Sequence, residues 1–268
     1  MNSSYIQINN LELIFAAALM ILTLVLNYIA RAKLAKDILS GTLRCFVQLM
    51  LIGYILKFIF SAGKWYWIIL ALSIMILVAG FEAVRREEKR GPMTYVYVTL
   101  AISTATVFIM SIGAGIILKI KPWFNPQYII PMMGMLVGNA MNGAALLINR
   151  LSSEITQNRE LIEAKLSLGA TSREAADRYI KEAIRSSMIP TINALMITGL
   201  VSLPGMMTGQ IIAGANPLDS VRYQITIMYM ISACNSITIF ALGFVAFKQY
   251  FTRNHQVKLE ILRKNNKE

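Results

Sequence analysis

Long apolar runs separated by short polar islands dominate this chain of 268 residues. A helix that spans a bilayer needs about 20 mostly apolar residues, and seven stretches meet that requirement. Because these runs lack the polar face that a helix presents to water, we expect an all-α, polytopic membrane protein with about seven transmembrane helices. The stretches cover residues 11–29, 41–60, 65–84, 95–118, 128–148, 188–212 and 223–247.

The composition supports a membrane location. Hydrophobic residues make up 56% of the chain and charged residues only 15%, whereas a soluble domain carries about 25% charged residues. The net charge of +12 raises the question of nucleic-acid binding, but the basic residues lie at the ends of apolar runs, where they determine membrane topology. We therefore expect contacts with membrane lipid, no nucleic-acid partner, and a multi-pass location in the inner (plasma) membrane.

The basic residues also predict the orientation of the chain. Twenty of the 26 Lys and Arg residues fall in three alternate connections, 31–36, 85–90 and 150–185, and in the tail after residue 247. Positively charged loops stay in the cytoplasm, so the N-terminus is expected outside and the C-terminus inside. Residues 1–268 are expected to form a single transmembrane domain, with a cytoplasmic loop at 150–187 and a basic cytoplasmic tail at 248–268.

The connection at 150–187 is long and has helical periodicity. Thr171 and Glu174 match the S/T-x-x-E pattern of a capping box, and Gly169 suits a turn after a shorter helix at 159–168. The pattern predicts a cytoplasmic helix–turn–helix, which docks in a groove of a partner or lies on the membrane as an ordinary amphipathic helix. Its second helix has an apolar face made of Ala176, Tyr179, Ile180, Ala183 and Ile184.

This loop resembles the EAA-x-x-x-G loop of ABC-importer permeases, in which a short helix inserts into a cleft of the ATP-binding subunit. The match is partial, because Lys165 stands where that consensus has its second alanine. The resemblance implies that the loop couples the chain to an ATPase. The candidate coupling residues are Glu163, Ala164, Gly169, Arg173 and Arg178.

Residues 203–217 are rich in proline and glycine inside an apolar run. Broken backbone at membrane depth is tolerated only where protein or water satisfies its polar groups, and it marks substrate paths in transporters. We combine this stretch with polar side chains of the neighbouring runs as a candidate translocation path, although such side chains also simply join helices by hydrogen bonds. The candidates are Asn139, Asn142, Asn193, Pro204, Gly205, Met206, Met207, Thr208, Gly209 and Gln210.

The sequence contains no H-E-x-x-H motif and no phosphate-binding loop, so we predict no catalytic residue and no cofactor in this chain. Methionine thioethers bind soft metals but also fill irregular gaps between helices. We interpret the clusters at 132–141 and 206–207 as packing, and the metal ligands remain unknown. Arg44 and Glu82 lie near the inner ends of their runs, where a functional role and snorkelling to the interface are equally compatible with the sequence.

Three stretches resemble a known family. They are the run from Pro131 to Asn142, the loop from Glu163 to Thr171 and, most clearly, the run GLVSLPGMMTGQIIAGA from Gly199 to Ala215. All three are similar to the FetB (YbbM) family of ABC-transporter permeases, and the resemblance extends over nearly the whole chain. It implies a transport subunit that works as a homodimer with a separate ATP-binding subunit, on which ATP and Mg²⁺ are held. In bacteria the implied role is export of a metal ion such as iron, whereas plant relatives are linked to aluminium tolerance.

Two other classes of function remain open at the level of sequence. A seven-helix sensor or receptor would use the cytoplasmic loop to bind a signalling partner. A secondary transporter driven by ions would carry acidic residues at membrane depth, and Glu82 is the marginal candidate.

Overall fold

The computed structural model describes residues 9–85, 93–252, 254 and 256–258. The expectations for the N-terminal residues 1–8, for the basic residues at 86–90 and for most of the basic tail lie outside these residues. The described part is built from helices: α1 (Asn10–Ile29), α2 (Ala35–Ala62), α3 (Trp65–Arg85), α4 (Thr94–Met110), the π-helix η1 (Ser111–Ile117), α5 (Pro126–Gln157), α6 (Arg159–Ser167), α7 (Ser172–Ile197), α8 (Gly205–Ile212), α9 (Pro217–Ala246) and the 3₁₀-helix η2 (Phe247–Tyr250).

Six helical segments of the described residues are long and apolar enough to cross a membrane. They are α1, α2, α3, α4 continued by η1, α5, and α9 continued by η2. Each corresponds to one of the predicted apolar runs, so the all-helical fold class is confirmed. The count of seven crossings and the orientation of the termini stay predictions.

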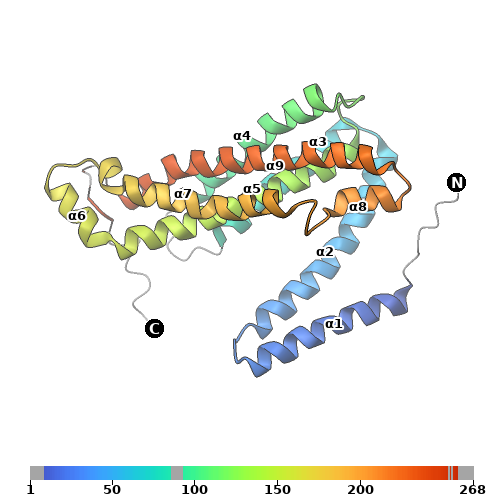
Figure 1. The fold of residues 1–268 in the computed structure, drawn as a ribbon, viewed down its shortest axis with the longest axis horizontal. Helices are drawn as coiled ribbons and strands as arrows, with labels where there is room; N and C mark the ends of the chain where they lie inside the picture. The colour runs from blue at the N-terminus through green and yellow to red at the C-terminus, as the bar shows by residue number, and fades with distance from the viewer. Residues whose placement is uncertain (1–8, 86–92, 253, 255, 259–268) are drawn as a thin grey trace. The chain divides into compact units, whose positions relative to one another are not determined.

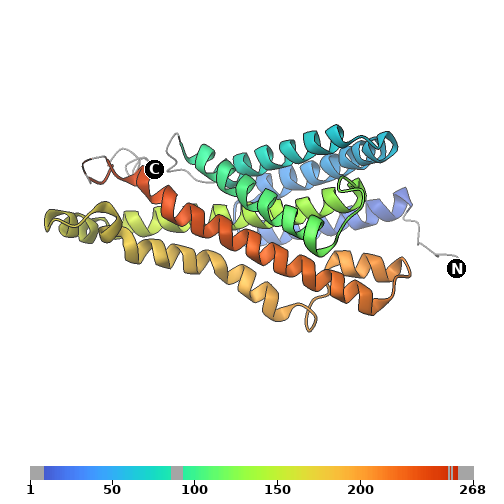
Figure 2. The same cartoon turned by 90° about the horizontal axis from the view of Figure 1, so that it is seen from above.

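The sixth predicted run, 188–212, is not one continuous helix. Helix α7 starts in polar sequence at Ser172 and ends at Ile197, and α8 starts only at Gly205. Gly199 has a φ of +91°, which glycine adopts without strain, and Pro204 lacks the N–H that a continuing helix needs. Figures 1 and 2 show α7 and α8 following one another in the same general direction before α9 returns.

Much of the predicted loop at 150–187 belongs to the long helices α5 and α7. Helix α5 continues to Gln157, and the second half of the region belongs to α7, which enters the apolar part without interruption. The ion pair between Arg150 and Glu154, 2.8 Å long, joins two successive turns of this extension of α5. The connection proper is therefore short and consists of α6 and its flanking turns.

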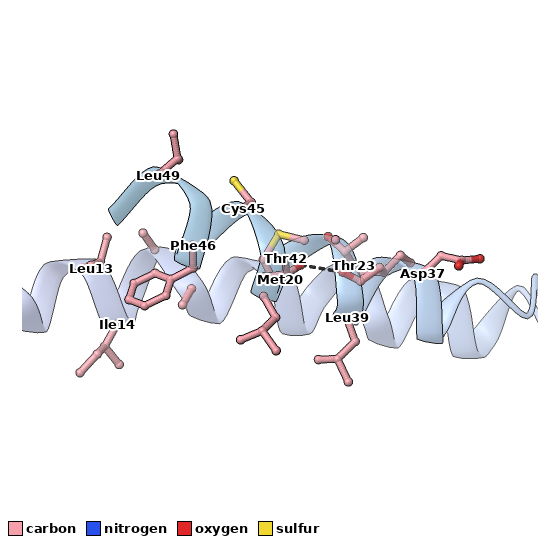
Figure 3. Close-up of a pocket in the computed structure, with 15 residues that line it drawn as sticks. Leu13, Ile14, Met20, Thr23, Asp37, Leu39, Thr42, Cys45, Phe46 and Leu49 are labelled. Carbon is pink, nitrogen blue, oxygen red and sulfur yellow. Dashed lines mark hydrogen bonds between the residues drawn. The ribbon is translucent and has the colours of Figure 1, made fainter. Parts of the chain in front are cut away.

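The chain divides into two compact units, residues 1–64 with 212–215, and residues 65–211 with 216–268. In the first unit, Ile59 is the only buried side chain among the described residues. An apolar groove of about 980 Å³ separates α1 from α2, and its lining includes Leu13, Met20, Phe46 and Leu49 (Figure 3). Apolar side chains with so little protein around them suit a hairpin that lies in hydrocarbon.

The core of the protein lies in the second unit. Helices α5 and α9 pack along each other and against both α4 and α7, while α3 packs on α4 and α5. Small residues allow close approach between membrane helices. A Cβ atom on Gly80 would lie 2.1 Å from Oγ1 of Thr99, and one on Gly243 would lie 2.6 Å from Cδ1 of Ile184.

A buried polar contact joins the three longest helices of this core. Asn235 of α9 is 3% exposed, and its Nδ2 donates a hydrogen bond to Oγ1 of Thr191 in α7. Its Oδ1 lies where a Cβ atom of Gly143 in α5 would be, 2.0 Å from the ideal position. Glycine at position 143 therefore makes room for the asparagine that links α7 to α9.

Substituting this glycine tests the packing. We expect Gly143→Ala to push Asn235 away from Thr191 and to lower the free energy of unfolding by about 1–3 kcal/mol, the usual cost of overpacking. The measurement is an unfolding titration of the purified protein in mixed micelles. Gly138→Ala is the matched control, because it lies on the same helix with open space around it, and alanine favours helix.

Equal effects of the two substitutions would contradict this account of the core. In the double variant Gly143→Ala/Asn235→Ala the clash is absent, so the two costs should not add.

Candidate functional site

Helix α6 and the polar first half of α7 form a helix–turn–helix between α5 and the apolar second half of α7. Helix α6 ends at Ser167, and Gly169 turns the chain with a φ of +90°. The predicted capping box at the start of α7 is confirmed, because the Thr171 side chain accepts from the backbone N–H of Glu174 and the Thr171 N–H donates to Glu174 Oε2 over 2.8 Å. The backbone N–H and the hydroxyl of Thr171 hold the pKa of Glu174 below its ordinary value.

The predicted apolar face of the second helix is also confirmed. All five residues of that face, Ala176, Tyr179, Ile180, Ala183 and Ile184, are buried. Arg178, Lys181 and Arg185 are exposed on the other side of α7. The helix therefore packs on the core through one face and exposes a charged face, which also carries Glu182 and the ion pair between Lys181 and Asp177.

Helix α6 carries an apolar ridge that the sequence analysis did not identify. Leu161 is 61% exposed and Leu168 is 89% exposed, and Ala164 between them is exposed as well. The spacing i, i+3, i+7 places the three on one line along the helix, whereas Ile162 points inward and is fully buried. An apolar residue that falls outside the buried face of an otherwise polar helix was the signal in the sequence.

The five predicted coupling residues have distinct places in this region. Glu163 accepts from Nε of Arg159 over 2.7 Å, Ala164 belongs to the apolar ridge, Gly169 makes the turn, and Arg178 is exposed on α7. The guanidinium of Arg173 lies 5.4 Å from the ring centre of Phe244 in α9, within the range of a cation–π interaction. Arg173 thus links the start of α7 to the end of α9.

The predicted path residues do not meet in an enclosed seam within one chain. Asn139 and Asn142 of α5 and Asn193 of α7 are exposed, and Nδ2 of Asn139 donates to the carbonyl of Met135 over 2.8 Å. On α8, Gln210 is half-buried and its Oε1 accepts no hydrogen bond within the described structure. The other members of the set lie around it: Met207 is buried, Pro204, Met206 and Thr208 are half-buried, and Gly205 and Gly209 are exposed.

The exposed asparagines belong to a longer polar stripe on α5. Beyond Leu146 the stripe continues through Asn149, Arg150 and Ser153, and the spacings of three and seven residues from Asn139 and Asn142 keep its members on one face of the helix. An amide or a charge that faces hydrocarbon is costly. This face of α5, which lies within a segment long enough to span a membrane, therefore needs water or protein against it.

The methionines contribute mostly to packing. Met132, Met133 and Met207 are buried, and the Sδ of Met132 accepts from the hydroxyl of Tyr223 over 3.3 Å. Glu82 forms an ion pair with Arg85 one turn away, at 3.2 Å. The residues that the structure describes contain no group of three or more His, Cys, Asp and Glu side chains close enough to hold a metal ion.

This chain is similar to known membrane proteins over most of its length. The model of an uncharacterised protein family, UPF0014, matches residues 10–251. A UPF0014 membrane protein of Synechocystis is 40% identical over 216 residues, which cover 80% of this chain and 83% of that protein. The probable iron export permease protein FetB of Escherichia coli is 33% identical over 263 residues, covering 96% of this chain and 98% of that protein.

A plant protein is similar over almost the same range. The Arabidopsis thaliana protein ALUMINUM SENSITIVE 3 is 34% identical over 250 residues, which cover 92% of this chain and 89% of that protein. No solved structure matches this chain. The family resemblance predicted from the sequence is therefore confirmed, and the chain is a multi-pass membrane protein.

The capping box offers a direct test of the helix–turn–helix. We expect Thr171→Ala to cost about 1 kcal/mol at the start of α7, seen as faster hydrogen exchange of the amides at 174–176. The pKa of Glu174 should rise part of the way toward its ordinary value, because the hydrogen bond that the Thr171 hydroxyl donates to Glu174 Oε2 over 2.8 Å is lost, while alanine keeps the backbone N–H that donates to the same oxygen. Because folding lowers the pKa of Glu174, its ionised carboxylate contributes its full stabilisation of the folded state at pH values above the ordinary carboxyl pKa. This contribution is lost as the pH falls through the pKa of Glu174 in the folded state.

Ser167→Ala is the control for this experiment. The Ser167 hydroxyl donates only to the carbonyl of Glu163 within α6, over 2.9 Å, so its loss should leave the exchange at 174–176 unchanged. The capping interpretation is wrong if Thr171→Ala exchanges like the wild type.

Proposed function

We propose, from the premise that this chain belongs to the UPF0014 family of membrane proteins, that it is the membrane-spanning permease subunit of an ABC transporter. Its cargo is a metal ion such as iron, and the direction is export. The observation that carries the proposal is the similarity to the probable iron export permease FetB over 98% of that protein. ATP and Mg²⁺ are bound by a separate ATP-binding subunit, and this chain has no catalytic residue.

The apolar ridge of α6 is the contact with that subunit. Leu161, Ala164 and Leu168 form a line of exposed apolar side chains, flanked by the charged residues Glu160 and Lys165. A short helix with an apolar ridge suits insertion into a groove of a partner. The basic residues of the neighbouring loops support a cytoplasmic location of this helix–turn–helix, which is the side on which an ATP-binding subunit would bind.

Movement of α6 reaches the membrane part through α7. This helix is continuous from Ser172 to Ile197, so a push at its start is transmitted along its axis. The contacts of Arg173 with Phe244 and of Thr191 with Asn235 tie it to α9 at two levels. Closure of the ATP-binding subunit therefore tilts α7 and α9 together, and the break at 198–204 separates this movement from α8.

The path for the cargo runs along the polar stripe of α5, between two copies of this chain. Asn139 and Asn142 face outward from the single chain, and a second copy against the same face would shield them from lipid. In such a homodimer the two stripes face each other across a polar channel. The half-buried Gln210 and the glycine-rich helix α8 contribute to its outer part, with the N-terminus outside and the C-terminus in the cytoplasm.

The docking proposal is tested with the ridge leucines. We expect Leu161→Glu and Leu168→Glu each to weaken binding of the ATP-binding subunit by about 2 kcal/mol or more, the loss typical of an interface hot spot, or roughly 30-fold in affinity. The measurement is a pull-down of the tagged chain in mild detergent, followed by titration of the recovered ATPase. Lys181→Ala is the control, because Lys181 is exposed on α7 away from the ridge and pairs with Asp177.

Capture of no ATPase by the wild type, even after crosslinking in the membrane, would contradict the permease proposal. A signalling partner in its place would favour the sensor hypothesis.

The two-copy path is tested by crosslinking. In a background without Cys45 and Cys234, we expect Asn142→Cys to form a disulfide-linked dimer on mild oxidation in membranes, because the α5 faces of the two copies oppose each other. Phe108→Cys is the control, since Phe108 is 57% exposed on α4 and apolar, as expected of a residue that faces lipid. The homodimer path is refuted if both positions crosslink alike or if neither does.

A further inference from the structure

A small pocket lies between α5 and α7 in the second unit, where Figure 1 shows the two helices side by side. Its volume is about 270 Å³. This is close to the lower end of ligand-pocket volumes, about 300 Å³, and it suits a compact group rather than a large organic ligand. The lining residues are Leu146, Asn149, Arg150, Ser153, Ser186 and Ser187.

The α5 residues of this pocket share one face of the helix. Positions 146, 149, 150 and 153 follow the spacing i, i+3, i+4, i+7, which places their side chains in a row. Leu146 closes the pocket toward the apolar part of α5, and the three polar residues lie on the side of the polar extension. The pocket thus sits where the apolar run of this helix, 128–148, ends.

Arg150, whose side chain is 46% exposed, is oriented by an ion pair with Glu154 on the same helix. Its Nη2 donates to Oε1 of Glu154 over 2.8 Å, and the Glu154 side chain is only 12% exposed. The other carboxylate oxygen of Glu154 accepts from Nδ2 of Asn158 over 3.3 Å. A guanidinium has five N–H donors in a fixed fork, so this one ion pair orients Arg150 and leaves most of its donors for the pocket that it lines.

The other polar groups of the pocket are also able to donate. Within the described residues, the Asn149 amide and the Ser186 hydroxyl make no hydrogen bond. Ser153 accepts from Nε2 of Gln157 over 3.0 Å, which leaves its O–H to donate. Ser187 already donates to the carbonyl of Ala183 over 2.7 Å and forms part of the wall.

We propose that this pocket binds a phosphate-type oxyanion, with Arg150 as the charged anchor and Asn149, Ser153 and Ser186 as additional donors. A guanidinium binds a phosphate through two parallel hydrogen bonds, and neutral amide and hydroxyl donors bind the remaining oxygens. The phosphate belongs to the headgroup of an anionic lipid, which the end of the apolar run would bring to the pocket, or to a soluble phosphate. Asn149, Arg150 and Ser153 also belong to the α5 stripe along which the cargo path is proposed, but phosphate binding at this pocket is measured without transport and does not rest on that path.

The test uses the full chain purified in mild detergent. Native mass spectrometry measures the affinity for phosphatidic acid, with phosphatidylcholine as the zwitterionic comparison, and inorganic phosphate is added as a competitor. We expect Arg150→Gln to weaken binding of phosphatidic acid at least roughly tenfold, because it removes charge-assisted hydrogen bonds. Arg222→Gln is the matched control, since Arg222 also pairs with a carboxylate on its own helix, Asp219 at 3.8 Å.

Two further variants separate binding from a structural role of the ion pair. Glu154→Gln frees the guanidinium and should leave binding unchanged or tighter, opposite to Arg150→Gln. Ser186→Ala keeps the ion pair intact and should weaken binding roughly fivefold, the effect of one hydrogen bond. Melting temperatures of all variants show which are folded, and Ser186→Ala still tests the site if Arg150→Gln does not fold.

Each outcome decides the proposal. Binding of phosphatidic acid that inorganic phosphate does not displace assigns the pocket to a lipid headgroup, and displacement by phosphate assigns it to a soluble oxyanion; both support the site. The proposal is overturned if Arg150→Gln binds like Arg222→Gln, if Arg150→Gln and Glu154→Gln weaken binding equally, or if neither form of phosphate binds the wild type.

Discussion

A polar group inside hydrocarbon needs a partner within the protein, and the second unit is organised by this requirement. Hydroxyl side chains meet it locally: Thr106 donates to the carbonyl of Ile102 over 2.7 Å, and Ser187 donates to that of Ala183 over the same distance. The Nδ2 of Asn235 bonds Thr191 across the α7–α9 interface, while its Oδ1 accepts no hydrogen bond within the described residues. That bond in turn requires a glycine at position 143 of α5.

Some of the places where a single chain does not meet this requirement are places where we locate function. The amides of the α5 stripe face outward, and the Oε1 of Gln210 accepts no hydrogen bond within the described residues. These groups are explained together if a second copy and a polar channel lie against α5. The ridge of α6 presents the opposite case, because there apolar side chains face the medium and a protein groove would cover them.

Run length and periodicity predicted about seven membrane helices, and six of these runs correspond to long apolar helices of the described residues. The same reasoning predicted the capping box at Thr171 and the buried face of α7, because each depends on neighbours within a few residues. Broken backbone was predicted at 203–217, but the structure shows that α7 already ends at Ile197 and that the break covers 198–204. Proline and glycine content located Pro204, whereas an average over an apolar run does not register one glycine at positive φ. The outward direction of Asn139 could not be predicted either. A polar residue within an apolar helix indicates that some partner is needed, but only the packing of α5 against α9 shows on which side that partner must lie.

Helix α7 contacts α9 at two positions along its length, and these contacts limit how the two helices can move relative to each other. Near its start, Arg173 lies over Phe244, and further along, Thr191 accepts from Asn235; both partners are on α9. A helix held at two points cannot rotate independently of the helix that holds it, so α7 and α9 move as one body. The backbone can yield at Pro190, which lacks the N–H for a helix hydrogen bond inside α7, and at the segment after Ile197, where Gly199 has a positive φ and the helix stops. Rigid coupling from α6 and a hinge before α8 therefore follow from the same set of contacts, and the hinge adjoins the residues predicted to line the outer part of the path.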